Sequence, residues 1–197
     1  MLLPALQKAK EQGNKIVCTG NLKQLGFANL LYAEDYDGVL ISGYFPTYIG
    51  PYVGLKNTSD YTYGTYYCPS QDKDTCYSWG NASDPYSIKG SYGYNYEYLC
   101  DKSIAGNCQG PQRLGSLKAP THLLMWADSW VTATPADSYV LISRNSSMAR
   151  TVSLRHNLGS NAVFADGSVH WYKQTEITRP SWDGTIARKY WGYLEVE

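Results

Sequence analysis

A long stretch without strand or turn signals opens the chain, from Leu3 to about Tyr36. Pro4 stands where the first turn of a helix tolerates proline, and Gly38 follows where helices commonly end. The pattern predicts one helix over residues 1–36, roughly 50 Å long, whose second half packs on the body while its first turns project. The core-facing stripe expected of that second half consists of Leu22, Leu25, Ala28, Asn29, Leu31 and Tyr32.

Near the other end of the chain, residues 161–172 carry apolar side chains on both sides of Asp166 and Gly167. Asp-Gly favours the positive φ angles of a two-residue hairpin loop, which would place Phe164 opposite Val169. Side chains alternate between the faces of a strand pair, so one side of this hairpin would be wholly apolar and meet the core. The side chains expected there are Ala162, Phe164, Val169 and Trp171.

Two further segments, residues 121–129 and 138–144, are short, apolar and bounded by turn residues, as buried strands are. Residues 89–100 fit either a strand or an extended aromatic loop. Together with the hairpin they predict an antiparallel sheet of about four strands. The expected fold class is α+β, with the helix followed by a head over residues 37–197 that has long irregular loops and a C-terminal segment wrapping the body.

Composition and charge restrict the partners. The 197 residues include 17 basic and 17 acidic side chains without a basic stripe, which argues against nucleic acid. The apolar start is far shorter than the roughly 20 residues of a membrane span, and no signal-peptide pattern is present. Because it runs straight into a helix, we expect a soluble piece cut from a longer chain.

Cysteine spacing does not indicate a zinc site, since no Cys-x-x-Cys pair or Cys/His cluster occurs. The alternative to free thiols is one or two disulfides formed in an oxidising compartment. The spacing does not select among the pairings of Cys18, Cys68, Cys76, Cys100 and Cys108.

Catalytic and metal sites find little support in the residues. His156, Asp166 and His170 offer imidazole and carboxylate ligands, but a hairpin with Asp166 at its tip gives no reason for them to converge. No Gly-x-Ser-x-Gly elbow or other arrangement of nucleophile, base and acid is evident. We therefore expect a protein that is not an enzyme.

A row of tyrosines suggests an alternative function. If residues 92–98 form a strand, alternate rings would line up on one face, where they could stack on sugars or pack against neighbouring strands. The alternative is thus a surface-anchored carbohydrate-binding module that uses Tyr92, Tyr94, Tyr96 and Tyr98.

The segment LLPALQKAKEQGNKIVCTGNLKQLGFANLLYAEDYDGVL is followed in order by YYCPS, GSYGYN, LKAPTHLLMWADS and RHNLGSNAVFADGSVHW. In these motifs the chain resembles prepilin-type proteins of the type II secretion pseudopilin and type IV pilin class. The branch concerned is marked by His, nine residues and Asp-Gly, a spacing that His156, Asp166 and Gly167 match. The resemblance covers nearly the whole chain but lacks the family's leader and the apolar first half of its helix.

The resemblance implies a pilin-like fold and a structural role in a bacterial surface filament or type II secretion pseudopilus. Its partners would be further copies or related pilin-like subunits, held through the N-terminal helix, with an absent apolar segment anchoring the protein in the inner membrane. The location would be extracytoplasmic, at the cell surface or in the periplasm. Small residues let helices approach closely, so the expected assembly face is Leu6, Ala9, Gly13, Ile16, Val17 and Gly20.

The resemblance also implies two features of chemistry. It favours a disulfide between Cys18 and Cys68, with Cys76 joined to Cys100 or Cys108 as a second. Pseudopilins of the major class commonly bind calcium through loop oxygens, which makes calcium the one cofactor suggested. Its candidate ligands are Asp128, Asp166 and Asp183.

Overall fold

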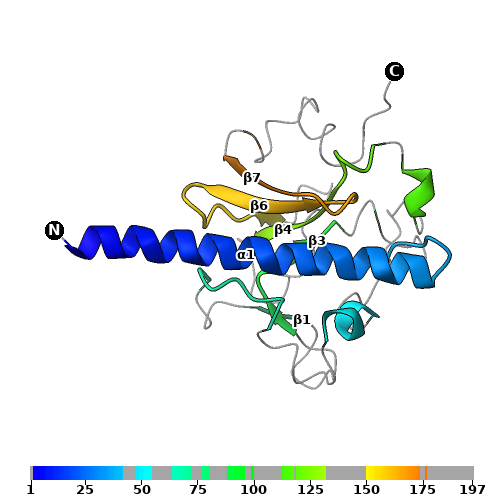
Figure 1. Cartoon of the computed structure of the whole chain (residues 1–197), viewed down its shortest axis with the longest axis horizontal. Coiled ribbons are helices and arrows are strands. Elements are labelled where there is room, and N and C mark those ends of the chain that lie inside the picture. The colour runs from blue at the N-terminus through cyan, green and yellow to red at the C-terminus, as the bar shows by residue number, and fades with distance from the viewer. Residues whose placement is uncertain are drawn as a thin grey trace.

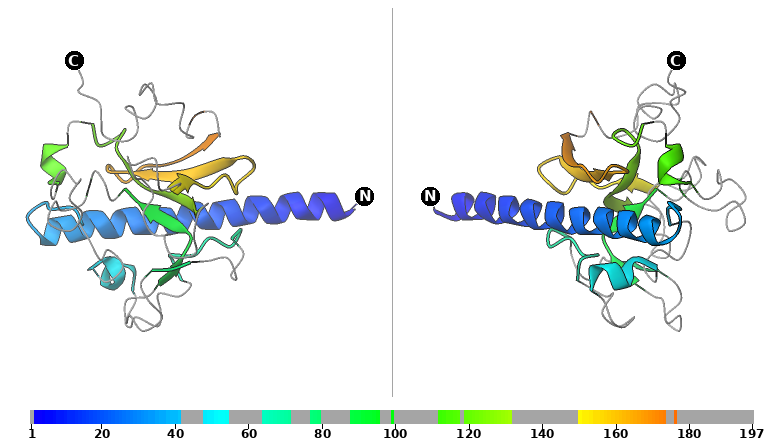
Figure 2. Two further views of the ribbon diagram at one scale, coloured as in Figure 1. Left: turned by 180° about the vertical axis from the view of Figure 1, so that it is seen from behind. Right: turned by 45° about the vertical axis from the view of Figure 1, so that its right-hand side comes forward.

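The computed structural model describes residues 2–41, 48–54, 64–71, 77–79, 88–95, 99, 112–117, 119–131, 150–173 and 176. A single long helix, α1 (Leu2–Asp35), lies across an antiparallel sheet. Its first turns extend beyond the described body of the molecule (Figure 1), as the view from behind and the view turned by 45° also show (Figure 2). The long helix and the α+β class are thereby confirmed. No helix in the described part of the chain is long and apolar enough to cross a membrane.

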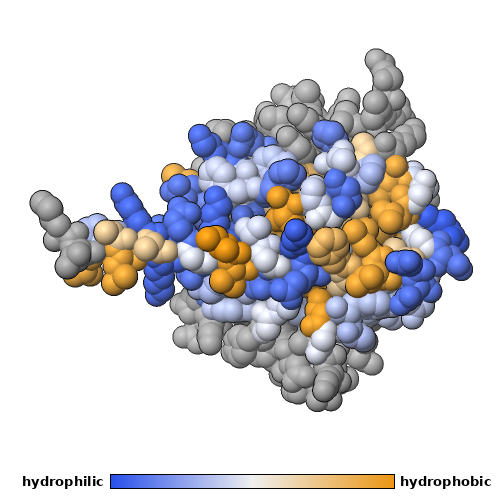
Figure 3. Space-filling model, in the orientation of Figure 1, coloured by the Kyte–Doolittle hydropathy of each residue, from blue (hydrophilic) through white to orange (hydrophobic). Residues whose placement is uncertain are grey.

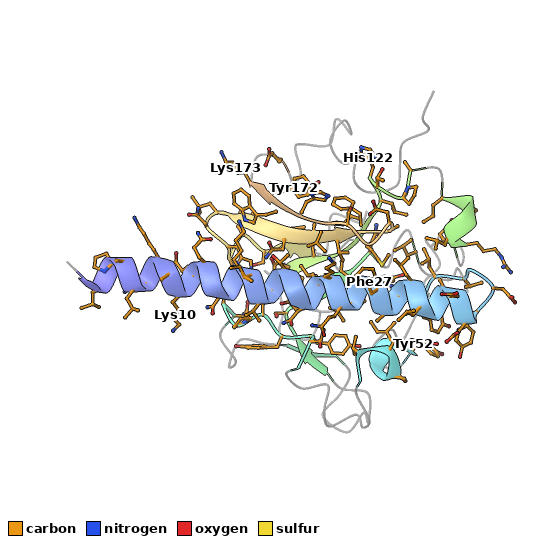
Figure 4. All side chains as sticks on the ribbon, in the orientation of Figure 1. Lys10, Phe27, Tyr52, His122, Tyr172 and Lys173 are labelled. Atoms are coloured by element: carbon orange, nitrogen blue, oxygen red, sulfur yellow. A yellow bond between two sulfur atoms is a disulfide. The ribbon has the colours of Figure 1, made fainter. Side chains whose placement is uncertain are left out.

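The end of α1 follows the sequence signal at Gly38. Asp37 and Gly38 take φ values of 52° and 80°, and the Gly38 N–H donates to the Ala33 carbonyl at 2.6 Å. A left-handed residue after the last turn closes a helix because its N–H reaches back to an orphan carbonyl. A short 3-10 helix, η1 (Gly50–Val53), is tied to this end, since the Tyr52 hydroxyl donates to Asp35 Oδ2 at 2.6 Å (Figure 4).

The main sheet has five described strands, and all of its pairings are antiparallel. In spatial order they are β3 (Tyr92–Tyr94), β4 (Leu124–Val131), β6 (Gly159–Phe164) and β7 (Val169–Lys173), with β5 (Arg150–Val152) paired to the end of β4. A separate two-stranded ribbon joins β1 (Tyr77–Trp79) and β2 (Ile88–Gly90), and a second short 3-10 helix is η4 (Leu114–Ser116). The strand predicted at 121–129 is β4, whereas the segment 138–144 and, apart from residue 176, the C-terminal wrap lie outside the described residues.

The β6–β7 hairpin turns where predicted, but its loop has three residues instead of two. The Phe164 N–H donates to the Ser168 carbonyl at 2.9 Å, which leaves residues 165–167 as the loop. Gly167 takes a φ of 80°, as the last residue of such a loop does after a type I turn. The Asp-Gly signal therefore located the turn correctly and predicted its length wrongly.

The extra loop residue shifts the register by one and redistributes the side chains between the two faces. Val163 now pairs with Val169, and Asn161 with Trp171, on the face toward α1. The four apolar residues expected on one face are thus divided between the two faces. Val169 and Trp171 lie on the face toward α1, whereas Ala162 and Phe164 lie on the opposite face. The opposite face carries Ala162, Phe164, His170 and Tyr172.

The core lies between α1 and the sheet, as expected for the second half of the helix. Leu22 and Leu25 are fully buried there. Gly26 lets the helix approach β6, because a Cβ at this position would stand 2.7 Å from Val163 Cγ2. Leu31 was expected in this stripe but is 48% exposed. It follows Leu25 by six positions, which turns it about a third of a turn away from the buried face.

Candidate functional site

Four side chains from four separate elements converge in the interior; we call them the buried cluster. They are Cys18 of α1, Cys68 of the segment 64–71, Asp128 of β4, and His156 of the turn ahead of β6. Their sulfur, nitrogen and carboxylate oxygen atoms all lie within 4.8 Å of one another, and all four residues are buried. The sequence named each residue for some role, but nothing in it placed the four together.

Cys18 and Cys68 form a disulfide, with their Cα atoms 5.3 Å apart. This pairing is the one that the family resemblance favoured, and the structure confirms it. By linking positions 50 residues apart it restricts the unfolded chain, which is worth about 4 kcal/mol in the loop-entropy model. The second pair expected from the resemblance, Cys76 with Cys100 or Cys108, lies outside the described residues.

Two sets of hydrogen bonds fix the backbone at His156. His156 and Gly159 exchange two hydrogen bonds of 3.1 Å, and between them Asn157 and Leu158 take φ values of 53° and 57°. Positive φ at both central residues is the signature of a tight type I′ turn. The Trp171 Nε1–H donates to the His156 carbonyl at 2.9 Å, which ties this turn to β7. The backbone that carries the imidazole is therefore held in place.

Within the cluster, His156 Nε2 faces both neighbours, at 3.3 Å from Cys68 Sγ and 3.5 Å from Asp128 Oδ2. A catalytic relay needs the acid on one ring nitrogen and the nucleophile on the other, so that the imidazole can pass a proton between them. Here the sulfur and the carboxylate share one nitrogen, and the sulfur is part of a disulfide. The geometry is that of a buried disulfide packed against a histidine and an aspartate, and it does not fit a catalytic proton relay.

Asp128 is only partly satisfied. The Asn161 N–H donates to its Oδ2 at 2.8 Å, while its buried Oδ1 has no hydrogen-bond partner within the described part of the structure. Burial, followed by the nearby charge of Asp128, raises the pKa of the Tyr92 hydroxyl. An unpaired buried carboxylate oxygen is costly, so Asp128 keeps an unused acceptor that a cation or a donor would satisfy.

The His-x9-Asp-Gly motif does not form one site. His156 lies at the start of β6, while Asp166 and Gly167 lie at its far end in the hairpin loop. Asp166 is exposed, and its Oδ1 accepts hydrogen bonds from the N–H (2.9 Å) and hydroxyl (2.7 Å) of Ser168. Its role in the structure is to stabilise the loop.

Neither set of metal ligands considered from the sequence comes together among the described residues. His170 is exposed beside Phe164 on the face away from α1, so His156, Asp166 and His170 do not converge. Asp128 is buried near the start of β6 and Asp166 stands beyond its end, so these proposed calcium ligands are also separated. The third, Asp183, lies outside the described residues.

The tyrosine row points inward where it is described. Tyr92 and Tyr94 are 4% and 0% exposed. The Tyr94 hydroxyl donates to the Ile41 carbonyl at 2.7 Å, and its ring lies 4.9 Å from that of Trp126. These two rings cannot stack on a sugar because protein covers them. Tyr96 and Tyr98 lie outside the described residues, so the structure argues against the carbohydrate hypothesis only at Tyr92 and Tyr94.

The predicted assembly face is open along the first half of α1, from the projecting turns to the first turns that contact the body. Leu6 and Ile16 are each 71% exposed and Val17 is 50% exposed. A Cβ added at Gly13 or Gly20 would meet no atom of the described residues within 4 Å, so both positions have space for a neighbour on the described part of the surface.

This apolar surface continues into the second half of α1. Phe27 and Leu31 are 47% and 48% exposed on the helix turns that cover the sheet. They follow Gly20 by seven and eleven positions, which places them on the same side of the helix. Apolar patches accordingly lie along α1 in the space-filling view (Figure 3), and Phe27 is labelled on the helix in Figure 4. We call the combined surface the outer face of α1: Leu6, Ala9, Gly13, Ile16, Val17, Gly20, Phe27 and Leu31.

No family model matches the chain, and no curated protein or solved structure matches it. The function must therefore be argued from two features, the outer face of α1 and the buried cluster.

Proposed function

We propose that the protein is a structural subunit of a bacterial surface filament or type II secretion pseudopilus, with a pilin-like fold, and that it assembles through α1. The observation that carries this proposal is the outer face of α1, an exposed apolar stripe on the side of the helix opposite the sheet. A helix that used only its own sheet for packing would be polar on this side.

The spacing of the stripe suits another helix. From Leu6 through Ala9, Gly13 and Ile16 to Gly20 the steps alternate between three and four residues. That alternation keeps a seam facing a neighbouring helix over many turns. The buried side follows a different set, in which Cys18, Leu22 and Leu25 face the body. One helix therefore offers two contact surfaces, one used within the subunit and one available to a neighbour.

The two glycines of the stripe support contact with a neighbour. Glycine inside a helix costs about 0.5–1 kcal/mol relative to alanine. At Gly26 the fold recovers this cost through close contact with Val163, but Gly13 and Gly20 have no such neighbour among the residues that the structure describes. A second helix approaching along the stripe would use their missing side chains, as small residues do in membrane bundles.

The other parts of the proposal concern location and partners. Partners would be further copies of this chain or related pilin-like subunits, since the stripe suits a similar helix. The Cys18–Cys68 disulfide supports an extracytoplasmic location, because such cross-links persist in oxidising compartments. Anchoring in the inner membrane through an apolar segment before α1 is taken from the family resemblance alone.

The test compares two neighbouring substitutions, Leu6→Glu on the outer face and Gln7→Glu beside it. Gln7 and Glu11 lie eleven and seven positions before Cys18, so they continue the body-facing side. Sedimentation velocity up to about 1 mM protein detects associations worth about 4 kcal/mol. We expect the natural chain and Gln7→Glu to associate with rising concentration and Leu6→Glu to remain monomeric. A natural chain that stays monomeric, or equal behaviour of the two variants, would contradict the proposal.

A further inference from the structure

The buried cluster has the composition of a metal centre, although its two sulfurs are joined. Two cysteines, one histidine and one aspartate supply the sulfur, nitrogen and oxygen ligands that Zn²⁺ takes in four-coordinate sites. We propose that the dithiol form of this protein binds one Zn²⁺ through Cys18, Cys68, Asp128 and His156, and that formation of the disulfide releases it. The proposal does not depend on assembly through α1.

The positions of the donor atoms carry the argument. A tetrahedral zinc centre with Zn–S bonds of about 2.3 Å holds its sulfurs about 3.8 Å apart, with nitrogen and oxygen closer still. All four donors already lie within 4.8 Å of one another. Opening the disulfide lets the sulfurs separate by side-chain rotation, while α1 and the segment 64–71 keep their Cα atoms near the present 5.3 Å. No movement of the sheet is needed.

The second observation is the unused capacity of the two other ligands. Asp128 Oδ1 is fully buried and has no hydrogen-bond partner within the described part of the chain. His156 Nε2 points at a disulfide sulfur, which is a weak acceptor, and at Asp128 Oδ2 from 3.5 Å. A cation between them would satisfy both groups at once. In the disulfide form Asp128 Oδ1 stays buried without a partner among the described residues, which costs free energy.

The shell around the cluster would orient these ligands. The Asn161 N–H already holds Asp128 Oδ2, and the Trp171 indole holds the turn that carries His156. The Cys68 N–H donates to the Ser91 hydroxyl, which fixes the backbone at that sulfur. Outer contacts of this kind set ligand direction in zinc centres. The spacing of the cysteines gave no hint of such a centre, because its ligands come from four separate elements.

The chemistry balances in both directions. Two thiols bind Zn²⁺ as thiolates and release two protons. Two thiolates and one carboxylate then face the divalent ion, with the imidazole neutral. An oxidising protein disulfide reverses the state. The two thiolates lose two electrons and form the Cys18–Cys68 bond, the oxidant takes up these electrons with two protons from solvent to become a dithiol, and Zn²⁺ leaves. The same place in the fold is thus cross-linked by metal before oxidation and by sulfur afterwards.

The test uses the full chain with Cys76, Cys100 and Cys108 changed to serine, so that only two thiols remain. A phosphine reductant opens the disulfide, forming two thiols and the phosphine oxide with oxygen from water, and is then removed without air. Co²⁺ is titrated as a spectroscopic probe of zinc geometry, and Zn²⁺ is used to displace it. We expect one equivalent to bind with tetrahedral d–d bands and sulfur charge-transfer absorption, and no binding to the oxidised chain.

Matched substitutions separate ligands from bystanders. Asp128→Asn and His156→Gln should weaken binding by more than the roughly 10–100-fold that loss of an outer-shell contact costs. Asp166→Asn and His122→Gln, at exposed positions, should leave it unchanged. Bound Zn²⁺ should also slow alkylation of Cys18 and Cys68 in the parent chain, by which we mean the chain with the three serine substitutions and no others. This measurement needs no further variant. A reduced parent chain without the tetrahedral spectrum, or without protected thiols, would overturn the proposal.

Discussion

The contrast between Gly26 and Gly13 gives a quantitative test of how α1 is used. Both lie inside the same helix, so replacing either by alanine gains up to about 1 kcal/mol of helix propensity. At Gly13 the new Cβ meets nothing within 4 Å. Gly13→Ala should therefore stabilise the isolated subunit by about 0.5–1 kcal/mol.

At Gly26 the same methyl group would stand 2.7 Å from Val163 Cγ2, closer than ordinary carbon contacts of about 3.5–4.0 Å. Val163 is fully buried, its β-branched side chain has little rotamer freedom, and β6 is held between β4 and β7. Overpacking of this kind costs about 1–3 kcal/mol. Both variants share the gain in helix propensity, so it cancels when they are compared. Gly26→Ala should therefore be less stable than Gly13→Ala by about 1–3 kcal/mol.

The assay is urea unfolding of the oxidised monomer, monitored by circular dichroism. The double variant Gly26→Ala with Val163→Ala removes the clashing methyl groups and should show a favourable coupling in a double-mutant cycle. If Gly26→Ala stabilised the protein as much as Gly13→Ala, the close contact between α1 and β6 would be refuted.

Three further predictions concern separate regions. Leu158→Gly should raise the unfolding free energy by about 1 kcal/mol, because Leu158 has a φ of 57° and is 73% exposed; a lower stability in thermal melts would contradict the turn geometry. The hydrogen bond to Asp35, with a smaller effect of burial, raises the pKa of Tyr52 from 10.0 to about 12. Its stabilising effect is therefore complete below pH 10 and lost toward pH 12, so the difference in Tm between the natural chain and Tyr52→Phe should vanish across this window and not at lower pH. In hydrogen exchange, amides of residues 8–13 should exchange much faster than those of residues 25–32, because of these two sets only the second packs on the sheet. Equal protection of the two sets in a monomer would mean that the projecting turns are covered.

Local signals in the sequence predicted much of the fold. Pro4 and Gly38 bound one helix, and Asp166 with Gly167 marked the hairpin, because helix ends and tight turns depend on a few neighbouring residues. The hairpin register was wrong by one residue. Asp-Gly suits both two-residue and three-residue loops, and only the packing of Val163 against Gly26 distinguishes them.

The candidate site was less accessible from the sequence. Asp128 and His156 were both noted for metal binding, yet with different partners from those they meet. The cysteines that they meet, Cys18 and Cys68, are 50 residues apart in the chain. The register of β4 positions Asp128 and the turn at Asn157 positions His156, so no local spacing in the sequence reveals that the four residues meet. Leu31 was misplaced for a simpler reason, since an apolar residue on a helix was taken to face the core when it lies on the outer face.

Site-specific photo-crosslinking tests the assembly proposal most directly. A benzophenone side chain placed at Ala9, on the outer face, should join one copy to α1 of another or of a related subunit. The same probe at Glu11, which lies two helix turns before the buried Cys18 and so on the body-facing side, should give few products between subunits. Products should be mapped by mass spectrometry in protein taken from the cell surface. Equal yields from the two positions, or products that map only within one chain, would contradict assembly through the outer face of α1.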